Sequence, residues 1–334
     1  MPSPIHLAFL GCGFATQLHS KTLAHFKQEA RWYYASRHRE KAMAFNKKYN
    51  GSGYFDSYDA AINDSRLEAV LVATPPFSHL ELTLQALRAG KHVIVEKPPF
   101  LHSTDFAAIR RAQDETGRRV LVAENYFYKP LACKLRELIR ADLVGDILFV
   151  HINALKKQTT GNWRDEAGLS GGGALFEGGI HWINFAANLG LAVKTVRGLR
   201  AGKHEGIEKS MLVAFEYEGG AVGTLLYSWE TPVLFKGLHF SQIYGRKGAI
   251  TFESNGLFIF VNGVKKKLIF PGLSDITGYK GMFRDFFHSL RTGQAPKMNL
   301  DVAEKDLQLI EAIYQSLVWL QTPPARDFSA RYSS

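Results

Sequence analysis

A lysine that closes an apolar segment is the residue around which the chemistry of this sequence is arranged. The run from His92 to Val95 is followed by Glu96, Lys97 and two prolines. Such a run bounded by proline is typical of a buried strand that delivers the lysine to its carboxyl end. Residues 69–76 have the same plan, with Thr74 and Pro75 after the apolar part. Because ligands bind at the carboxyl edge of open α/β sheets, the two segments predict a shared site. An ordinary surface lysine is the alternative for Lys97.

A carboxylate and a histidine lie four residues apart behind a glycine-rich stretch. Glu177 and His181 follow residues 170–173, which read Ser-Gly-Gly-Gly. In a helix that begins near Ala174 these two side chains share one face, and the helix dipole favours a carboxylate near the N-terminus. Imidazole titrates near neutral pH, so the pair predicts a proton-transfer unit in which Glu177 orients His181. A structural hydrogen bond is the alternative; the glycines favour function because they would leave room for a ligand.

A glycine-rich turn near the start predicts where a dinucleotide binds. The apolar residues 5–10 lead into Gly-x-Gly-x-x-Thr, and a helical stretch follows. The glycines permit a tight turn and close approach of a pyrophosphate, and the amides of the helix complete the anion site. Contacts with the cofactor are expected from Gly11, Gly13, Phe14 and Ala15. The third fingerprint position is usually Gly or Ala, so the bulkier Thr16 is expected to loosen the packing of helix on strand.

The residues after the second predicted strand indicate which dinucleotide binds. Ser36 and Arg37 lie about 20 residues beyond the glycines, where an acidic residue would bind the adenosine ribose of NAD. A small hydroxyl followed by arginine suits the 2′-phosphate of NADP, because the guanidinium fork matches phosphate. We therefore predict NADP(H) in preference to NAD(H). An exposed basic start to the next helix is the alternative.

The predicted elements divide the chain in two. Strands at 5–10, 31–35, 69–73, 92–95 and 119–123 alternate with helices, which predicts a doubly wound parallel sheet. A helix at 131–141 follows, and then short turns separate strand-like segments, which predicts a mostly antiparallel sheet. Those segments are 147–154, 195–199, 210–217, 221–229, 239–244, 249–253 and 257–261, before closing helices at 282–291 and 302–319. The expected fold class is α/β, with a Rossmann domain over residues 1–123 and an α+β domain with a large open sheet over 124–334.

Composition narrows the class of protein. A length of 334 residues with 46% hydrophobic and 22% charged residues is typical of a soluble globular protein of two domains. The net charge of +10 comes from dispersed basic residues without a nucleic-acid module, so we expect attraction for a phosphorylated ligand and no nucleic-acid binding. Cys12 and Cys133 match no metal spacing, and no metal is expected. The first apolar stretch is too short for a membrane span and precedes no cleavage site, which predicts a cytoplasmic protein.

These motifs together resemble the glucose-fructose oxidoreductase / inositol dehydrogenase / rhizopine-catabolism (Gfo/Idh/MocA) family of nicotinamide-dependent oxidoreductases. The resemblance rests on Gly11-Cys12-Gly13 with His19, Thr74-Pro75 with His79, Ala89 to Val93 through Glu96-Lys97-Pro98, and Ser170 to Gly173 through His181. It implies NAD(P)-dependent oxidation or reduction of a sugar or polyol. It also implies that the second domain's open sheet forms oligomer contacts, so a homodimer or homotetramer is expected. A dinucleotide-sensing protein without turnover is the alternative, against which the retention of Lys97 and His181 argues.

The resemblance also implies roles for single residues. Lys97 matches the family's catalytic lysine and His181 its usual acid/base, whereas Glu177 stands where relatives usually have Asp. Glu96 matches a position that contacts the nicotinamide ribose, and Thr74, Pro75 and His79 belong to the expected cofactor site, although His79 also suits a packing role at a helix start. The Lys97-Pro98 bond resembles one that is often cis. Substrate-facing positions fall at Asn125, Tyr126, Tyr128 and Lys129. Trp163, Arg164 and Trp229 are candidates for a pocket lining, with packing or a surface position as the alternative.

Overall fold

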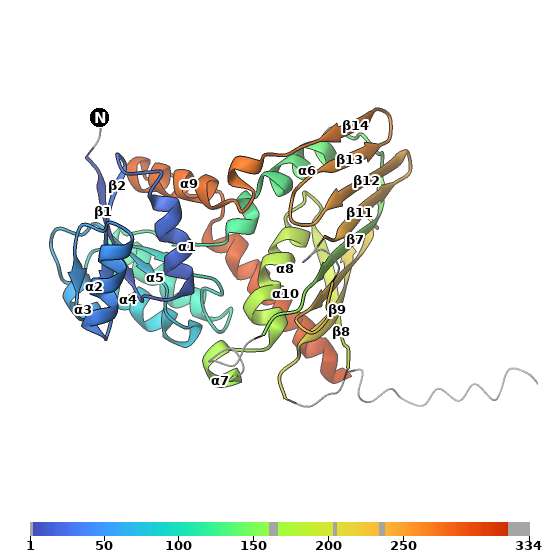
Figure 1. Cartoon of the computed structure of the whole chain (residues 1–334). Helices are drawn as coiled ribbons and strands as arrows, with labels where there is room; N and C mark the ends of the chain where they lie inside the picture. Colours follow the sequence, from blue (N-terminus) through green and yellow to red (C-terminus); the bar gives the residue numbers. More distant parts are fainter. Residues whose placement is uncertain (1–2, 160–165, 203–205, 234–237, 320–334) are drawn as a thin grey trace, which may run out of the picture.

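The chain forms two β-sheets with helices packed against them (Figure 1). A computed structural model describes residues 3–159, 166–202, 206–233 and 238–319. The first sheet is built from residues before position 123 and the second from residues after position 146. The proposed boundary at 123/124 lies between the two sheets, although two helices from the end of the chain also contact the first part.

The first sheet has six parallel strands in the order β3-β2-β1-β4-β5-β6. Its strands are β1 (Ile5–Leu10), β2 (Ala30–Ala35), β3 (Tyr54–Phe55), β4 (Ala69–Val72), β5 (His92–Val95) and β6 (Val120–Val122). The order is that of the doubly wound dinucleotide-binding fold. All residues of β4 are buried, which explains its unbroken apolar sequence. The predicted parallel sheet is confirmed, and only the two-residue β3 was not predicted.

Helices connect these strands. They are α1 (Phe14–Leu23), α2 (Arg39–Lys48), α3 (Tyr58–Ile62), α4 (His79–Arg88) and α5 (Asp105–Thr116), with the short turn η1 (Pro76–Ser78) before α4. After β6 come η2 (Asn125–Tyr128) and α6 (Pro130–Arg140). The positive φ of Gly117 ends α5 in a left-handed conformation that glycine adopts without strain.

The second sheet has eight strands in the order β14-β13-β12-β11-β7-β10-β9-β8. They are β7 (Ile147–Leu155), β8 (Val193–Arg200), β9 (Ser210–Tyr217), β10 (Val222–Ser228), β11 (Phe240–Gly245), β12 (Gly248–Glu253), β13 (Ile259–Asn262) and β14 (Lys266–Ile269). Neighbouring strands are antiparallel except β7 and β10, which pair in parallel. The predicted, mostly antiparallel sheet is thus confirmed, and β14 was missed because its lysines suggested a solvated run.

Helices cover one face of the second sheet (Figure 1). The remaining elements are α7 (Ala167–Ser170), η4 (Leu175–Gly179), α8 (Ile180–Ala187), η6 (Leu273–Asp275), α9 (Tyr279–Thr292) and α10 (Leu300–Trp319). Helix α8 packs Phe185 against Phe252 of β12, and α10 lies so close to β8 that a Cβ on Gly198 would meet Ile313 at 2.7 Å. The opposite face presents apolar side chains, including Phe149, Val222 and Tyr244 on neighbouring strands.

Helix α9 joins the second half of the chain to the first. It lies beside α1 in Figure 1, and its Phe283 and Phe287 contact Phe26, which follows α1. Phe283 also meets the edge of the His19 ring at 5.5 Å between centroids. The two parts thus share an apolar contact.

A search of the described residues finds no helix with the length and apolar character that a membrane crossing requires.

Candidate active site

The glycine turn after β1 has the geometry that a dinucleotide needs. Gly11 has φ +112°, and a Cβ there would approach the carbonyl oxygen of Ala73 at 2.7 Å, so glycine is required. At Gly13 a Cβ would meet nothing within 4 Å, which leaves the turn open to a ligand. Gly13 begins α1 and no side chain caps its first amides. Exposed amides at a helix N-terminus bind phosphate, so this turn can hold a pyrophosphate.

Thr16 stabilises the turn that it was expected to loosen. Its side chain is fully buried, and its Oγ1 donates a hydrogen bond of 2.7 Å to the carbonyl oxygen of Gly11. The extra bulk is accommodated because the hydroxyl has a backbone partner. The expectation of poor packing at the third fingerprint position is therefore wrong.

A groove of about 730 Å³ runs from this edge of the sheet over η1 and α4. Arg37, Thr74 and Pro75 line it, together with Tyr58 and Phe77. Burial raises the pKa of Tyr58, and the neighbouring Arg37 opposes that shift. Ser36 is buried, and its Oγ accepts a hydrogen bond from the backbone amide of His38. Of the remaining predicted contacts, Phe14 is 66% exposed and Ala15 half-buried beside the glycines.

His79 lies inside the protein and not in the groove. It is fully buried, with Nδ1 at 2.9 Å from the carbonyl oxygen of Pro98 and Nε2 at 2.8 Å from that of Thr74. Burial lowers its pKa. The imidazole thus links the segments that follow β4 and β5 by contacts with their backbone carbonyl oxygens. This is the packing role that the sequence offered for His79.

Glu96 is held by groups on both sides. Its Oε1 contacts His19 Nε2, and its Oε2 accepts a hydrogen bond of 3.0 Å from the amide of Lys97. Burial opposes its ionisation, but the bond with His19 and the charge of Lys97 keep the pKa of Glu96 below its usual range. The carboxylate therefore fixes the backbone where Lys97 begins, ahead of a cis Lys97-Pro98 bond.

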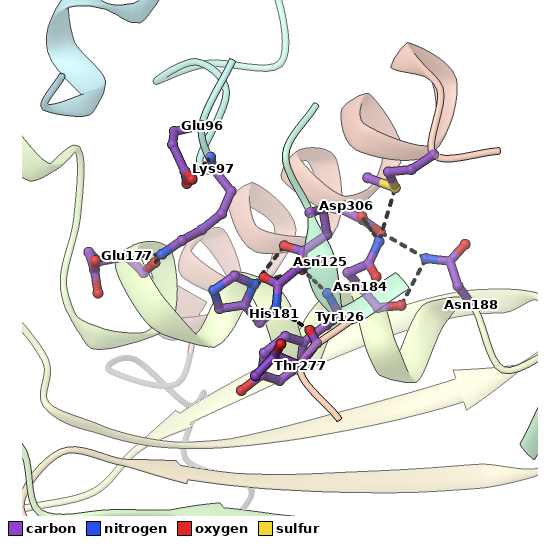
Figure 2. Close-up of polar contacts among 12 residues, drawn as sticks. Glu96, Lys97, Asn125, Tyr126, Glu177, His181, Asn184, Asn188, Thr277 and Asp306 are labelled. Carbon is purple, nitrogen blue, oxygen red and sulfur yellow. Dashed lines mark hydrogen bonds and ion pairs between the residues drawn. The ribbon is translucent and has the colours of Figure 1, made fainter. Parts of the chain in front are cut away.

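Lys97 reaches across to the second half of the chain, as Figure 2 shows. Its Nζ donates a hydrogen bond of 2.7 Å to the carbonyl oxygen of Glu177 and lies 3.6 Å from Glu177 Oε1. Both side chains are largely buried, at 15% and 9% exposure. A buried ammonium needs such a partner, since an unpaired buried charge is costly.

The segment that carries Glu177 is a π-helical turn. Residues Leu175–Gly179 form η4, and an α-helix begins only at Ile180. Glu177 is paired with Lys97, and another carboxylate contacts His181.

The glycines around η4 serve close packing of the protein. A Cβ on Gly173 would lie 2.4 Å from the backbone oxygen of Glu208, and one on Gly178 would lie 2.3 Å from the hydroxyl of Tyr227. The glycines at 171–173 were expected to leave room for a ligand. Instead they let the turn press against neighbouring segments.

Glu124 is the carboxylate that contacts His181. The Nδ1 atom of His181 lies 2.7 and 2.9 Å from the two oxygens of Glu124, which is 2% exposed. Tyr126 stacks on the imidazole with centroids 4.4 Å apart (Figure 2). Sequence reasoning missed Glu124, although it follows β6 as Thr74 follows β4 and Lys97 follows β5. Its place at a third strand end was the signal that could have found it.

Other residues considered for the substrate site are mostly engaged in the protein. Asn125 Nδ2 donates to the carbonyl oxygen of Thr277, and the Tyr128 hydroxyl donates to Asp285. Trp229 is buried and donates to the Tyr227 hydroxyl. Lys129 is buried, with its Nζ 4.4 Å from the centroid of the Tyr126 ring, and burial lowers its pKa to about 8. Trp163 and Arg164 lie outside the described residues.

Among the described residues no group of three or more His, Cys, Asp or Glu side chains is placed to hold a metal ion.

Comparisons with known proteins agree with this geometry. A family model described as the oxidoreductase family with an NAD-binding Rossmann fold (GFO_IDH_MocA) matches residues 5–124, and the GFO/IDH/MocA C-terminal domain matches residues 133–251. Oxidoreductase P35 of Formosa agariphila is 28% identical over 193 residues, which are 55% of this chain and 60% of that protein. D-xylose 1-dehydrogenase (NADP(+)) 2 of Haloferax volcanii is 22% identical over 84% of this chain and 88% of its own.

A solved structure supports the same fold. Levoglucosan dehydrogenase, in complex with NADH and levoglucosan, superposes with a TM-score of 0.84 at 20% identity, over 95% of this chain and 98% of its own. The first model covers the six-stranded sheet with the glycine turn and Lys97, and the second covers His181 and the strands β7 to β11 of the other sheet. The chain therefore belongs to the Gfo/Idh/MocA family of oxidoreductases.

Proposed function

We propose that the protein is an NADP(H)-dependent oxidoreductase that transfers a hydride to or from a hydroxyl or carbonyl carbon of a sugar or polyol. The observation that carries this proposal is the meeting of Lys97, from the sheet edge beside the glycine turn, with the segment that bears His181. A cation and an imidazole beside a dinucleotide site can together handle one hydroxyl group. The names of the two similar dehydrogenases support a carbohydrate substrate.

The cofactor would be held along the carboxyl edge of the first sheet. The amides of residues 11–15 would bind the pyrophosphate, Thr74 and Pro75 would line the groove, and Glu96 would lie near the nicotinamide ribose. Arg37, which lines the groove beside Tyr58, would bind the 2′-phosphate with help from Ser36. When bound, the nicotinamide supplies the hydride acceptor or donor.

The protein's own groups would manage the substrate oxygen and its proton. His181 takes the hydroxyl proton during oxidation and returns it during reduction. The Lys97 ammonium hydrogen-bonds the same oxygen and stabilises the negative charge that develops there. Glu177 holds that ammonium through its backbone oxygen and its carboxylate. In this proposal Glu177 orients the cation, whereas the sequence suggested that it orients the imidazole.

Assembly and location complete the proposal. The uncovered face of the second sheet would form contacts in a homodimer or homotetramer, since its apolar side chains gather on neighbouring strands. Both cysteines are free thiols, which suits a reducing cytoplasm.

The test is cofactor-linked turnover with a panel of sugars, polyols and their phosphates. Purified protein with NADP+ or NADPH is followed at the absorbance of the reduced nicotinamide. The expected result is substrate-dependent oxidation or reduction with at least one member of the panel. Tight NADPH binding without any redox change across the panel would instead support a dinucleotide sensor.

A further inference from the structure

The His181 ring is fixed from two directions. Its Nδ1 faces both oxygens of Glu124, and its face lies on Tyr126 with an interplanar angle of 15°. Glu124 is itself held, because its Oε1 accepts a hydrogen bond of 2.9 Å from the amide of Tyr126. No residue in the described part of the chain makes a hydrogen bond to Nε2 of His181. In the proposed reaction that nitrogen faces the substrate.

We propose that Glu124 is a positioning residue for proton transfer and that Glu124 and His181 act as one unit holding either one or two exchangeable protons. This inference rests on the proposed function, since it concerns the proton that accompanies the hydride. We call the pair the Glu124–His181 dyad.

The dyad can take the proton of the substrate hydroxyl during oxidation and return it during reduction. With one proton, Nδ1–H donates to the Glu124 carboxylate and Nε2 carries a lone pair. During oxidation the substrate O–H bond breaks and its proton goes to Nε2, while the hydrogen on carbon leaves as hydride to the oxidised nicotinamide and a carbonyl forms. The dyad then holds two protons. During reduction it returns one to the carbonyl oxygen as the reduced nicotinamide delivers its hydride. A carboxylate behind the imidazole stabilises the second proton.

The charges around the dyad determine its proton affinity. Around His181 lie Glu96, Lys97, Lys156 and Glu177, and around Glu124 lie Glu96, Lys97, Tyr126, Lys129, Tyr279 and Asp306. Burial, followed by the charge of Lys97, lowers the pKa of His181 well below its usual range. Burial raises the pKa of Glu124 to about 8. Both shifts favour a neutral carboxyl beside a neutral imidazole at pH 7, which together hold two exchangeable protons.

A definite pH dependence follows. Oxidation needs the dyad with one proton, so its rate rises as the pH increases through the dyad's titration. Reduction needs the dyad with two protons, so its rate falls over the same range. A lone imidazole among two lysines would instead gain its second proton only at low pH.

Glu124→Gln tests the proposal because it keeps the shape and removes the charge. Both directions should slow by about 10²-fold. In a plot of oxidation rate against pH, the rise on the acid side (the acid limb) should move to lower pH. The reason is that His181 must then be protonated without a carboxylate beside it. Glu124→Asp retains the charge and should restore the position of the limb and part of the rate. The matched control is Asp285→Asn, which alters another carboxyl held by hydrogen bonds, from the Tyr128 hydroxyl and from the backbone amide of Lys297. In this control variant the oxidation rate should rise at the same pH as in the wild type.

A second measurement does not depend on turnover. Nitrogen-15 NMR of the His181 ring should show a proton on Nδ1 at high pH in the wild type and both tautomers in Glu124→Gln. A proton on Nε2 in the wild type at high pH would overturn the inference, as would a Glu124→Gln variant with an unchanged pH profile. If the wild type turns over nothing in the panel, the proposed function fails, and the tautomer still decides whether Glu124 positions the ring.

Discussion

Single residues show both the reach and the limit of sequence reasoning. Lys97 could be predicted because a strand and a proline place it at a sheet edge, and the contact with Glu177 agrees with that placement. Glu124 could not be paired with His181 from sequence. The two residues are 57 positions apart, and only the packing of α8 beside the end of β6 brings them together.

Lys97→Ala should lower kcat by about 10² to 10³-fold, because the variant lacks the cation that stabilises the developing negative charge. Binding of NADPH, measured by its fluorescence, should change little. Lys134→Ala is a suitable control, because this lysine is paired with Glu137 on the surface of α6. Near-normal turnover in Lys97→Ala would contradict the assignment.

Arg37→Ala tests cofactor preference. If the guanidinium grips the 2′-phosphate, the dissociation constant for NADPH should rise by about 10 to 100-fold while that for NADH stays the same. Fluorescence titration with both dinucleotides measures the difference. Equal affinities in the unaltered protein would refute the preference for NADP(H).

At the scale of elements, hydrophobic pattern and turn residues predicted nearly every strand and helix, because each is either buried on both faces or alternates between core and solvent. The π-helical turn η4 was beyond such reasoning. Its sequence carries no periodicity that separates it from an α-helix, and its shape depends on close packing against Glu208 and Tyr227. Glu177 of this turn pairs with Lys97 in the structure.

Substitutions at Gly11 and Gly13 in the glycine turn can separate an effect on folding stability from an effect on NADPH binding. Gly11→Ala should lower the free energy of unfolding by about 1–3 kcal/mol, because the new Cβ meets Ala73 and the positive φ is strained. Gly13→Ala should leave stability nearly unchanged, since its Cβ meets no protein atom, yet weaken NADPH binding by occupying the space for pyrophosphate. Chemical denaturation and fluorescence titration of both variants decide the matter. A Gly13→Ala variant that binds NADPH normally would place the pyrophosphate elsewhere.

The whole molecule departs from a simple sequence of two domains. The two sheets follow one another in the chain as predicted, but α9 comes after the second sheet and packs on α1. The sequence pattern of α9 does not identify the helix against which it packs, because an amphipathic helix indicates only that one face is buried.

Phe283→Ala tests how much the contact between α9 and the first part of the chain contributes to stability. Phe283 is fully buried between His19, Phe26 and Phe286, so the substitution should cost about 3–5 kcal/mol of unfolding free energy. Phe270→Ala, at a residue that is 66% exposed, is the matched control and should change stability little. Equal effects of the two substitutions in urea denaturation would show that α9 is not held by this contact.

The bare face of the second sheet predicts self-association. Sedimentation equilibrium should report a dimer or tetramer, and Phe149→Asp on β7 should shift it towards the monomer, because a charge would be buried at the contact. A wild-type protein that is monomeric at micromolar concentration would rule this assembly out.

The return of α9 also bears on how a substrate enters. The chain passes between the two halves after β6, before α9 and again after it. A hinge usually concentrates rotation in a few residues of a single connection. Here three connections would have to bend together, and the ion pairs of Arg110 on α5 with Asp301 and Glu304 on α10 would have to break. Such multiple tethering favours a site whose walls are already in place before the substrate arrives, so that selectivity would come from the fit of those walls rather than from domain closure.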